Sequence, residues 1–97
     1  MRFKNKAVIV TGGSSGIGRA ICKLLASEGA AVTVFDRTEE AREGGRPTVA
    51  EIMEAGGSAE FVQGDVASED DLDRVVSAVV ARHGRLDVMI NNAATSV

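Results

Sequence analysis

A glycine-rich turn is the feature that most constrains how this chain folds. The segment VIVTGGSSGIGRA, residues 8–20, places four glycines between two apolar runs. The run before them, AVIVT (7–11), is continuous and β-branched, which is typical of a strand buried on both faces. The run after them has apolar residues spaced by three and four, which predicts a helix packed on a sheet through Ile17, Ala20, Ile21, Leu24 and Leu25. Strand, turn and helix in this order predict the opening unit of an α/β fold.

The same alternation continues to the end of the sequence. Further strands are expected at residues 31–35, 59–63 and 86–90, with helices after Pro47 and after Ser68. Residues 37–46 are polar and irregular, and we expect an exposed loop or a frayed helical turn there. The order β-α-β-α-β-α-β predicts a Rossmann-like, doubly wound parallel sheet in three α/β/α layers, with strand order 3-2-1-4. The expectation is one partial domain of this kind over 1–97, truncated after its fourth strand.

Several residues are placed to begin or end these helices. Ser14 or Ser15 can cap the first helix, and Gly29 follows its end. Pro47 fits the first turn of the second helix. SEDD (68–71) resembles a capping box for the third helix, which Gly84 ends.

Composition excludes several classes of partner. A net charge of −3 gives no electrostatic reason to expect nucleic acid or an anionic membrane, and no apolar run is long enough for a membrane span. No signal peptide is expected at the N-terminus. Cys22 is the single cysteine, so no internal disulfide can form and a cytoplasmic location is expected.

The glycine turn predicts an anion-binding site. At the carboxyl edge of a parallel sheet, the next helix directs its free N–H groups and positive dipole end outward, where a pyrophosphate fits. Gly12 permits the tight turn, Gly16 lets the backbone approach a phosphate, and Gly18 lets the helix pack closely on the strand. Ser14 and Ser15 supply hydroxyls for the phosphate or for the helix cap.

Two rival phosphate or cofactor loops fit less well. A P-loop needs Lys and then Ser or Thr after its last glycine, whereas Arg19 and Ala20 follow Gly18 here. A loop that binds a methyl donor normally has an acidic residue before its first glycine, where this chain has Thr11. A third reading, a turn with no ligand, is weakened by the position of the glycines between a strand and a helix.

Asp36 ends the second strand, 18 residues beyond Gly18. A dinucleotide site needs an acidic residue about 20 residues on, to hydrogen-bond the adenosine ribose hydroxyls. Its carboxylate would repel a 2′-phosphate, so NAD is favoured over NADP. Arg37 argues the other way, because a guanidinium there could neutralise that phosphate.

These residues resemble the short-chain dehydrogenase/reductase family. The family's T-G-x-x-x-G-x-G loop is matched by Thr11 and the three glycines, its acidic selector by Asp36, its D-V pair by residues 65–66, and its N-N-A-G motif by residues 91–94. Ala94 replaces the last glycine, and the 37–46 segment is longer than usual. The resemblance implies cofactor contacts from Gly12, Ser14, Ser15, Gly16, Ile17, Gly18, Asp36, Arg37, Asp65, Val66, Asn92 and Ala93.

The resemblance also implies hydride transfer between a nicotinamide cofactor and an alcohol or carbonyl substrate, in a homo-oligomer. The family's catalytic serine, tyrosine and lysine lie beyond the fourth strand, and this sequence contains no tyrosine. No catalytic residue is therefore assigned: Ser96 follows the asparagine motif too closely to substitute, and Asn91 and Asn92 have no titratable proton. Residues 1–97 alone are expected to be inactive. The alternative is a non-catalytic dinucleotide-binding or interaction module.

The remaining chemistry-bearing residues have structural explanations. Cys22 is expected to pack in the first helix, and His83 to suit the C-terminal end of the third. The acidic cluster at 69–71 suits a helix N-terminus, and no metal site is expected around it. The fourth strand would be an open edge that carries Val88, Met89 and Ile90, so self-association of the 97-residue chain is predicted.

Overall fold

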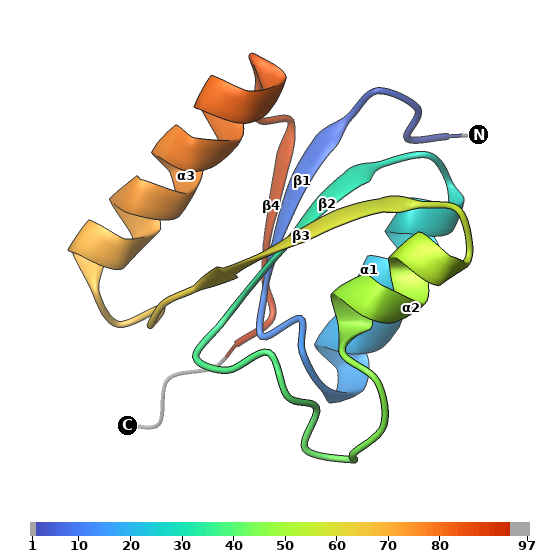
Figure 1. Cartoon of the computed structure of the whole chain (residues 1–97). Coiled ribbons are helices and arrows are strands. Elements are labelled where there is room, and N and C mark those ends of the chain that lie inside the picture. Colours follow the sequence, from blue (N-terminus) through green and yellow to red (C-terminus); the bar gives the residue numbers. More distant parts are fainter. Residues whose placement is uncertain (1, 94–97) are drawn as a thin grey trace.

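Four parallel strands form the centre of the computed structural model, which describes residues 2–93 (Figure 1). Their order is β3-β2-β1-β4, as predicted from the sequence. The elements in chain order are β1 (Ala7–Thr11), α1 (Gly16–Ser27), β2 (Ala31–Asp36), α2 (Thr48–Glu54), β3 (Ser58–Gln63), α3 (Glu69–His83) and β4 (Val88–Asn91). The expectations about Ala94 and Ser96 concern residues outside the described part.

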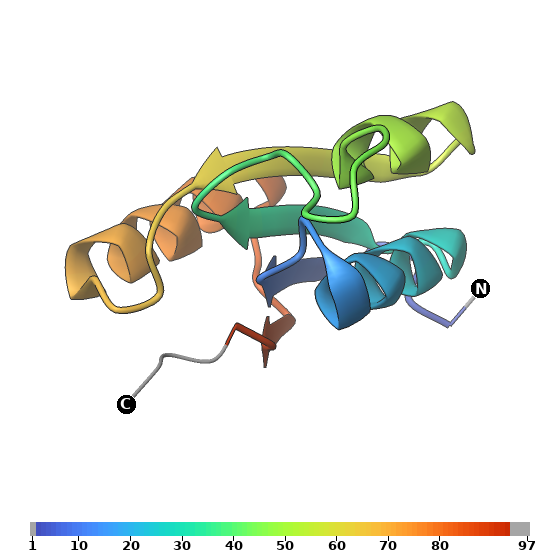
Figure 2. The ribbon, with the colours of Figure 1, turned by 90° about the horizontal axis from the view of Figure 1, so that it is seen from below.

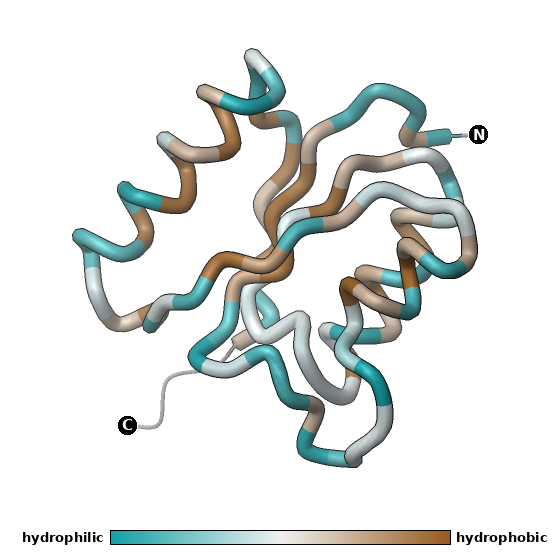
Figure 3. The backbone as a smooth tube through the Cα atoms, viewed as in Figure 1, coloured by the Kyte–Doolittle hydropathy of each residue, from teal (hydrophilic) through white to brown (hydrophobic). Residues whose placement is uncertain are grey.

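The sheet lies between two helical layers. α1 and α2 cover one face and α3 covers the other (Figures 1 and 2). β1 is buried along its whole length because Val8 and Val10 point into the α1–α2 side and Ala7 and Ile9 into the α3 side. This is why its sequence is continuously apolar rather than alternating, and the strands form the brown centre of Figure 3.

The predicted buried face of α1 was wrong in part. Ile17 and Leu24 are 73% and 63% exposed, whereas the helix buries Gly18, Arg19, Cys22, Leu25 and Ala26. The true face is rotated because two of its positions carry a glycine and an arginine, which an apolar pattern does not count. Gly18 belongs to the glycine turn, and Arg19 makes a polar contact with the segment before α2.

The helix ends follow the sequence with small differences. Ser68 caps α3 by accepting a hydrogen bond from Asp71 N at 3.1 Å, but the Asp71 carboxylate turns to Asp65 N at 2.9 Å, so the capping box is only half formed. Gly84 ends α3 with φ +75°, in the left-handed conformation. Pro47 is the N-cap of α2 rather than a member of its first turn.

None of the helices in residues 2–93 combines the length and the apolar character that crossing a bilayer needs.

Candidate functional site

The glycine turn joins β1 to α1 in a geometry that only glycine permits at two points. Gly12 has φ +69° and its N–H donates to the Phe35 carbonyl oxygen at 2.8 Å, which ties the turn to β2. A Cβ on Gly18 would lie 2.1 Å from the Gly12 carbonyl oxygen. The predicted tight turn and close helix packing are both confirmed.

Gly16 serves a different purpose. It has φ +55°, and a Cβ built on it would meet nothing within 4 Å. The helix begins here, so its first N–H groups have no partner within the helix. There is therefore room for another group on the outer side of the turn, and the approach of a phosphate there stays a prediction. Ile17, in the same first turn, is exposed to solvent.

Asp36 lies beside this turn at the carboxyl end of β2. Its Oδ2 accepts a hydrogen bond from Ser14 N at 3.0 Å, and its Oδ1 accepts one from Arg37 N at 2.8 Å. A carboxylate has about four acceptor positions. These two hydrogen bonds leave two of the positions for other donors, and the Ser14 contact places the carboxylate next to the glycine turn.

The carboxyl ends of β2 and β3 border a hollow of about 390 Å³. Asp65 lies in its wall, and its Oδ2 pairs with the Arg37 guanidinium at 3.2 Å. Val66 packs partly buried against the cluster that contains Phe35. Asp65 therefore lines this recess together with Arg37, whose guanidinium is already engaged by the Asp65 carboxylate.

The end of β4 closes the other side of the turn. Asn92 Nδ2 donates to the Gly12 carbonyl oxygen at 3.3 Å, and Ala93 N donates to Thr11 Oγ1 at 3.1 Å. Thr11 Oγ1 in turn donates to the Ile90 carbonyl oxygen at 3.4 Å. The predicted motifs at the ends of all four strands thus meet at one edge of the sheet.

The segment between β2 and α2 contributes contacts that the sequence did not indicate. Residues 37–46 were expected to be an exposed loop or a frayed helical turn, and residues 37–47 form a loop that crosses the glycine turn (Figure 2). Ser14 Oγ donates to the Thr38 carbonyl oxygen at 2.6 Å, and Ser15 Oγ accepts from Arg42 N at 2.7 Å. Ser15 is the N-cap residue of α1, but its hydroxyl makes no cap bond there.

The carboxylate of Glu43 takes that role instead. Gly16 N donates to Glu43 Oε2 at 3.0 Å, and this hydrogen bond is the main reason that the pKa of Glu43 lies below its ordinary value of 4.5. A side chain from the loop therefore holds an anion at the N-terminus of α1, where a dipole and unpaired N–H groups favour one.

Arg19 of α1 binds the C-terminal end of the loop. Its guanidinium is nearly buried, donates to the Arg46 carbonyl oxygen at 2.6 Å, and pairs with Glu51 at 2.8 Å. Thr48 Oγ1 accepts a bond from Arg19 and donates to the Gly13 carbonyl oxygen at 2.8 Å. The sequence gives no signal for this anchor, because the apolar periodicity of α1 leaves Arg19 outside the predicted buried face.

The thiol of Cys22 is enclosed by the core and stays protonated at neutral pH. The side chain is fully buried, and burial raises the pKa of the thiol to about 12. A Cβ on Gly13 would lie 2.8 Å from Cys22 Sγ, so this helix residue packs directly under the turn. The expected packing role is confirmed.

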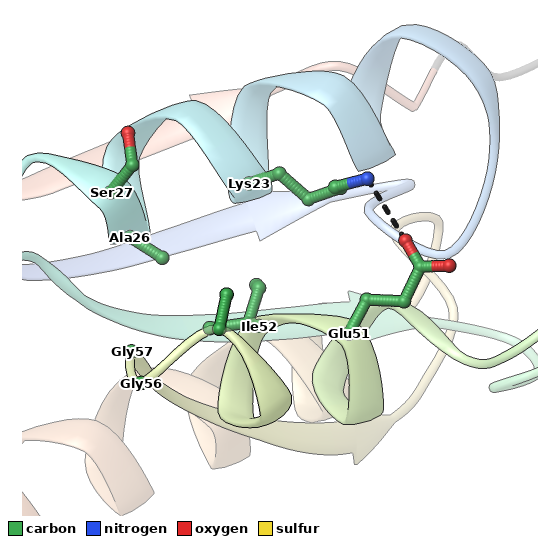
Figure 4. A pocket seen from close by; sticks show the side chains of 8 residues that line it. Lys23, Ala26, Ser27, Glu51, Ile52, Gly56 and Gly57 are labelled. Atoms are coloured by element: carbon green, nitrogen blue, oxygen red, sulfur yellow. Dashed lines mark hydrogen bonds and ion pairs between the residues drawn. The ribbon is translucent and has the colours of Figure 1, made fainter.

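A second hollow, of about 320 Å³, lies between α1 and α2 (Figure 4). Lys23 and Glu51 pair across it at 2.9 Å. It is lined by the C-terminal parts of both helices and by Gly56 and Gly57, which precede β3. It therefore lies toward the amino ends of the strands, away from the glycine turn.

Among residues 2–93, no three or more His, Cys, Asp or Glu side chains are grouped closely enough to hold a metal ion. His83 Nε2 lies 3.7 Å from a Glu60 carboxylate oxygen at the end of α3.

Comparison with known proteins gives a consistent result. Residues 6–97 match the short chain dehydrogenase family. A 3beta-hydroxysteroid dehydrogenase of Mediterraneibacter gnavus is 42% identical over 92 residues, covering 95% of this chain and 32% of the relative. A short-chain dehydrogenase/reductase homolog of Bacillus subtilis is 40% identical, covering 96% of this chain and 84% of the relative.

Solved structures agree with these relatives. A metagenomic short-chain oxidoreductase in complex with NADP superposes with a TM-score of 0.86 and 38% identity, over 98% of this chain and 42% of that one. The chain spans about a third of the length of several of the curated relatives that it matches, with shares of 32% and 36%.

Proposed function

The chain belongs to the short-chain dehydrogenase family and corresponds to its N-terminal portion, and from this premise we propose that it binds NAD at the carboxyl edge of the sheet. The family's function is hydride transfer with a nicotinamide cofactor. The protein that contains this portion would transfer hydride between NAD and an alcohol or carbonyl substrate. The finer assignments, to NAD and to individual residues, are our inference.

The observation that carries the proposal is the convergence on the glycine turn. Asp36, at the end of β2, accepts a hydrogen bond from Ser14 N. Asn92, which follows β4, donates one to the Gly12 carbonyl oxygen. The site suits a dinucleotide, because there is open space beside Gly16, whose N–H would exchange the exposed Glu43 carboxylate for a phosphate, and because two acceptor positions on Asp36 remain for a ribose.

We assign roles to the remaining residues on the same basis. Gly12, Ser14, Ser15, Gly16, Ile17 and Gly18 would line the pyrophosphate. Asp36 would hold the adenosine ribose with Arg37 beside it, Asp65 and Val66 would border the adenine, and Asn92 and Ala93 would lie toward the nicotinamide. Bound there, the cofactor supplies the hydride chemistry, and the chain's own residues position it.

The preference for NAD rests on charge. The Asp36 carboxylate would face a 2′-phosphate as a like charge, and the Arg37 guanidinium that could offset it pairs with Asp65. A solved relative is in complex with NADP, so the fold itself also accepts the phosphorylated cofactor. The preference of this chain for NAD or NADP therefore depends on the side chains near the ribose.

Titration of the purified protein with NADH and NADPH tests this assignment. We expect NADH to bind more tightly, and Asp36→Asn to weaken NADH by about tenfold because a charge-assisted hydrogen bond to the ribose is lost. The matched control is Asp73→Asn, which removes an exposed carboxylate on α3 and should leave NADH binding unchanged. Tighter binding of NADPH, or equal effects of both variants, would contradict the assignment.

The composition favours one alternative, a dinucleotide-binding module without catalysis. The 97 residues contain no tyrosine and so do not supply the acid–base group that the family uses. An alcohol oxidation assay that follows NADH formation separates the two: we expect binding without turnover for residues 1–97 alone. Turnover by that chain would overturn this expectation.

A further inference from the structure

The loop of residues 37–47 places a second carboxylate at the dinucleotide site. Asp36 Oδ2 accepts from Ser14 N at 3.0 Å, and Glu43 Oε2 accepts from Gly16 N at 3.0 Å. The two acidic side chains therefore flank the same three-residue stretch of the turn, with Ser15 between them.

The position of Glu43 is defined by contacts on both sides of it. Before it, Arg42 N donates to Ser15 Oγ at 2.7 Å. After it, the Arg46 carbonyl oxygen accepts from the nearly buried Arg19 guanidinium at 2.6 Å. These contacts hold the exposed Glu43 carboxylate over the turn, whereas Glu39 and Glu40 in the same loop have no side-chain hydrogen bond or ion pair among residues 2–93.

A ribose bound by Asp36 would lie beside this stretch, because Asp36 is itself bonded to Ser14. A 2′-phosphate on that ribose adds about 1.5 to 2 negative charges. It would meet two carboxylates there. Glu43 is ionised at neutral pH, since its hydrogen bond from Gly16 lowers its pKa.

Resting on the proposed function, we propose that Glu43 is a specificity-determining residue that favours NAD over NADP by repelling a 2′-phosphate from the Ser14–Gly16 stretch. This adds a second source of selectivity to Asp36. It comes from a loop that was predicted only as a connection.

The test uses ADP-ribose and 2′-phospho-ADP-ribose, which differ only in the 2′-phosphate and need no nicotinamide pocket. Their dissociation constants are measured by calorimetry for the wild type, Glu43→Gln and Glu43→Lys. We expect Glu43→Gln to tighten the 2′-phosphorylated probe by about tenfold, a charge effect of moderate size at an exposed site, and Glu43→Lys to tighten it further. ADP-ribose should tighten by a smaller factor, because it gains only the Gly16 N–H that both probes share and it lacks the repelled 2′-phosphate.

Glu39→Gln and Glu39→Lys are the matched controls. They change the net charge of the same loop equally but remove no contact to the glycine turn, so they should leave the ratio of the two constants near the wild-type value. Circular dichroism spectra of all variants confirm that the fold is retained.

Three results would overturn the proposal. In the first, Glu43→Gln changes both probes equally, which would make Glu43 a competitor of the shared pyrophosphate rather than a selector. In the second, the Glu39 variants match the Glu43 variants. In the third, the wild type prefers 2′-phospho-ADP-ribose and Arg42→Gln abolishes that preference, which would make the loop a binder of the phosphate. If the wild type binds neither probe, the proposed function fails as well; binding of ADP-ribose with unchanged selectivity in Glu43→Gln refutes this inference alone.

Discussion

At the scale of the residue, three glycines of the turn have three different reasons to be glycine. Gly12 needs a positive φ, Gly18 needs the absence of a Cβ, and Gly16 has a positive φ with open space around it. The same residue type therefore serves backbone conformation, close packing and, at Gly16, a positive φ in open space.

These reasons predict different costs for alanine. In Gly18→Ala the new Cβ would lie 2.1 Å from the Gly12 carbonyl oxygen, so the backbone must shift, and we expect a loss of about 3 kcal/mol of unfolding free energy. In Gly16→Ala only the left-handed conformation is penalised, at about 1–2 kcal/mol. Urea unfolding followed by circular dichroism measures both. An equal loss in the two variants would contradict this account of the turn.

At the scale of the element, Asp87 connects β1 to the edge strand β4 near their amino ends. It lies just before β4, and its Oδ2 accepts from Ala7 N, the first residue of β1, at 2.8 Å. Arg85 pairs with the same carboxylate at 2.6 Å. The hydrogen bond from Arg85 and then that from Ala7 N hold the pKa of Asp87 below its ordinary value of 3.8.

This shift predicts an acid-sensitive contribution to stability. Because the folded pKa lies below the unfolded one, the contribution is present above the unfolded pKa, near 3.8, and is lost as the pH falls through the folded pKa. In Asp87→Asn this part of the pH dependence should disappear, so the difference in stability from the wild type should shrink as the pH falls below about 4.

Thermal unfolding of both proteins between about pH 2 and pH 7 measures this difference. Asp73→Asn on α3 is the control, since Asp73 forms no ion pair among residues 2–93. A gap between wild type and Asp87→Asn that stays constant across this range would show that Asp87 acts through packing and not through its charge.

At the scale of the whole molecule, the two edges of the sheet differ in how well they resist pairing with another chain. β3 carries Glu60 and β4, with the sequence VMIN, carries no charge. Within residues 2–93, β4 pairs with β1 alone. An uncharged, half-buried edge strand is a template for further strand pairing.

We therefore predict that the 97-residue chain, expressed by itself, self-associates. Sedimentation velocity should show an average mass that rises above 10.1 kDa with concentration. Met89→Lys places a charge on the edge and should reduce the association, with circular dichroism as the check on folding. A monomer at every concentration would contradict the prediction.

The strand order and the meeting of motifs at one edge follow from sequence because they rest on local periodicity and on the chirality of parallel crossovers. The 37–47 loop and its Glu43 contact did not follow, since a polar irregular segment has no periodicity that places its side chains. The buried face of α1 was partly wrong for a related reason: Gly18 and Arg19 are buried by a close approach and by a polar anchor, and neither leaves a hydrophobic signal.

The central claim is that a dinucleotide binds at the carboxyl edge of this sheet, and amide chemical shifts during an NADH titration test it most directly. The account predicts that the shifts concentrate at residues 12–18, at Asp36, at residues 65–66 and at residues 92–93. Shifts confined to the hollow between α1 and α2, around Ala26 and Gly57, or no shifts at all, would contradict it.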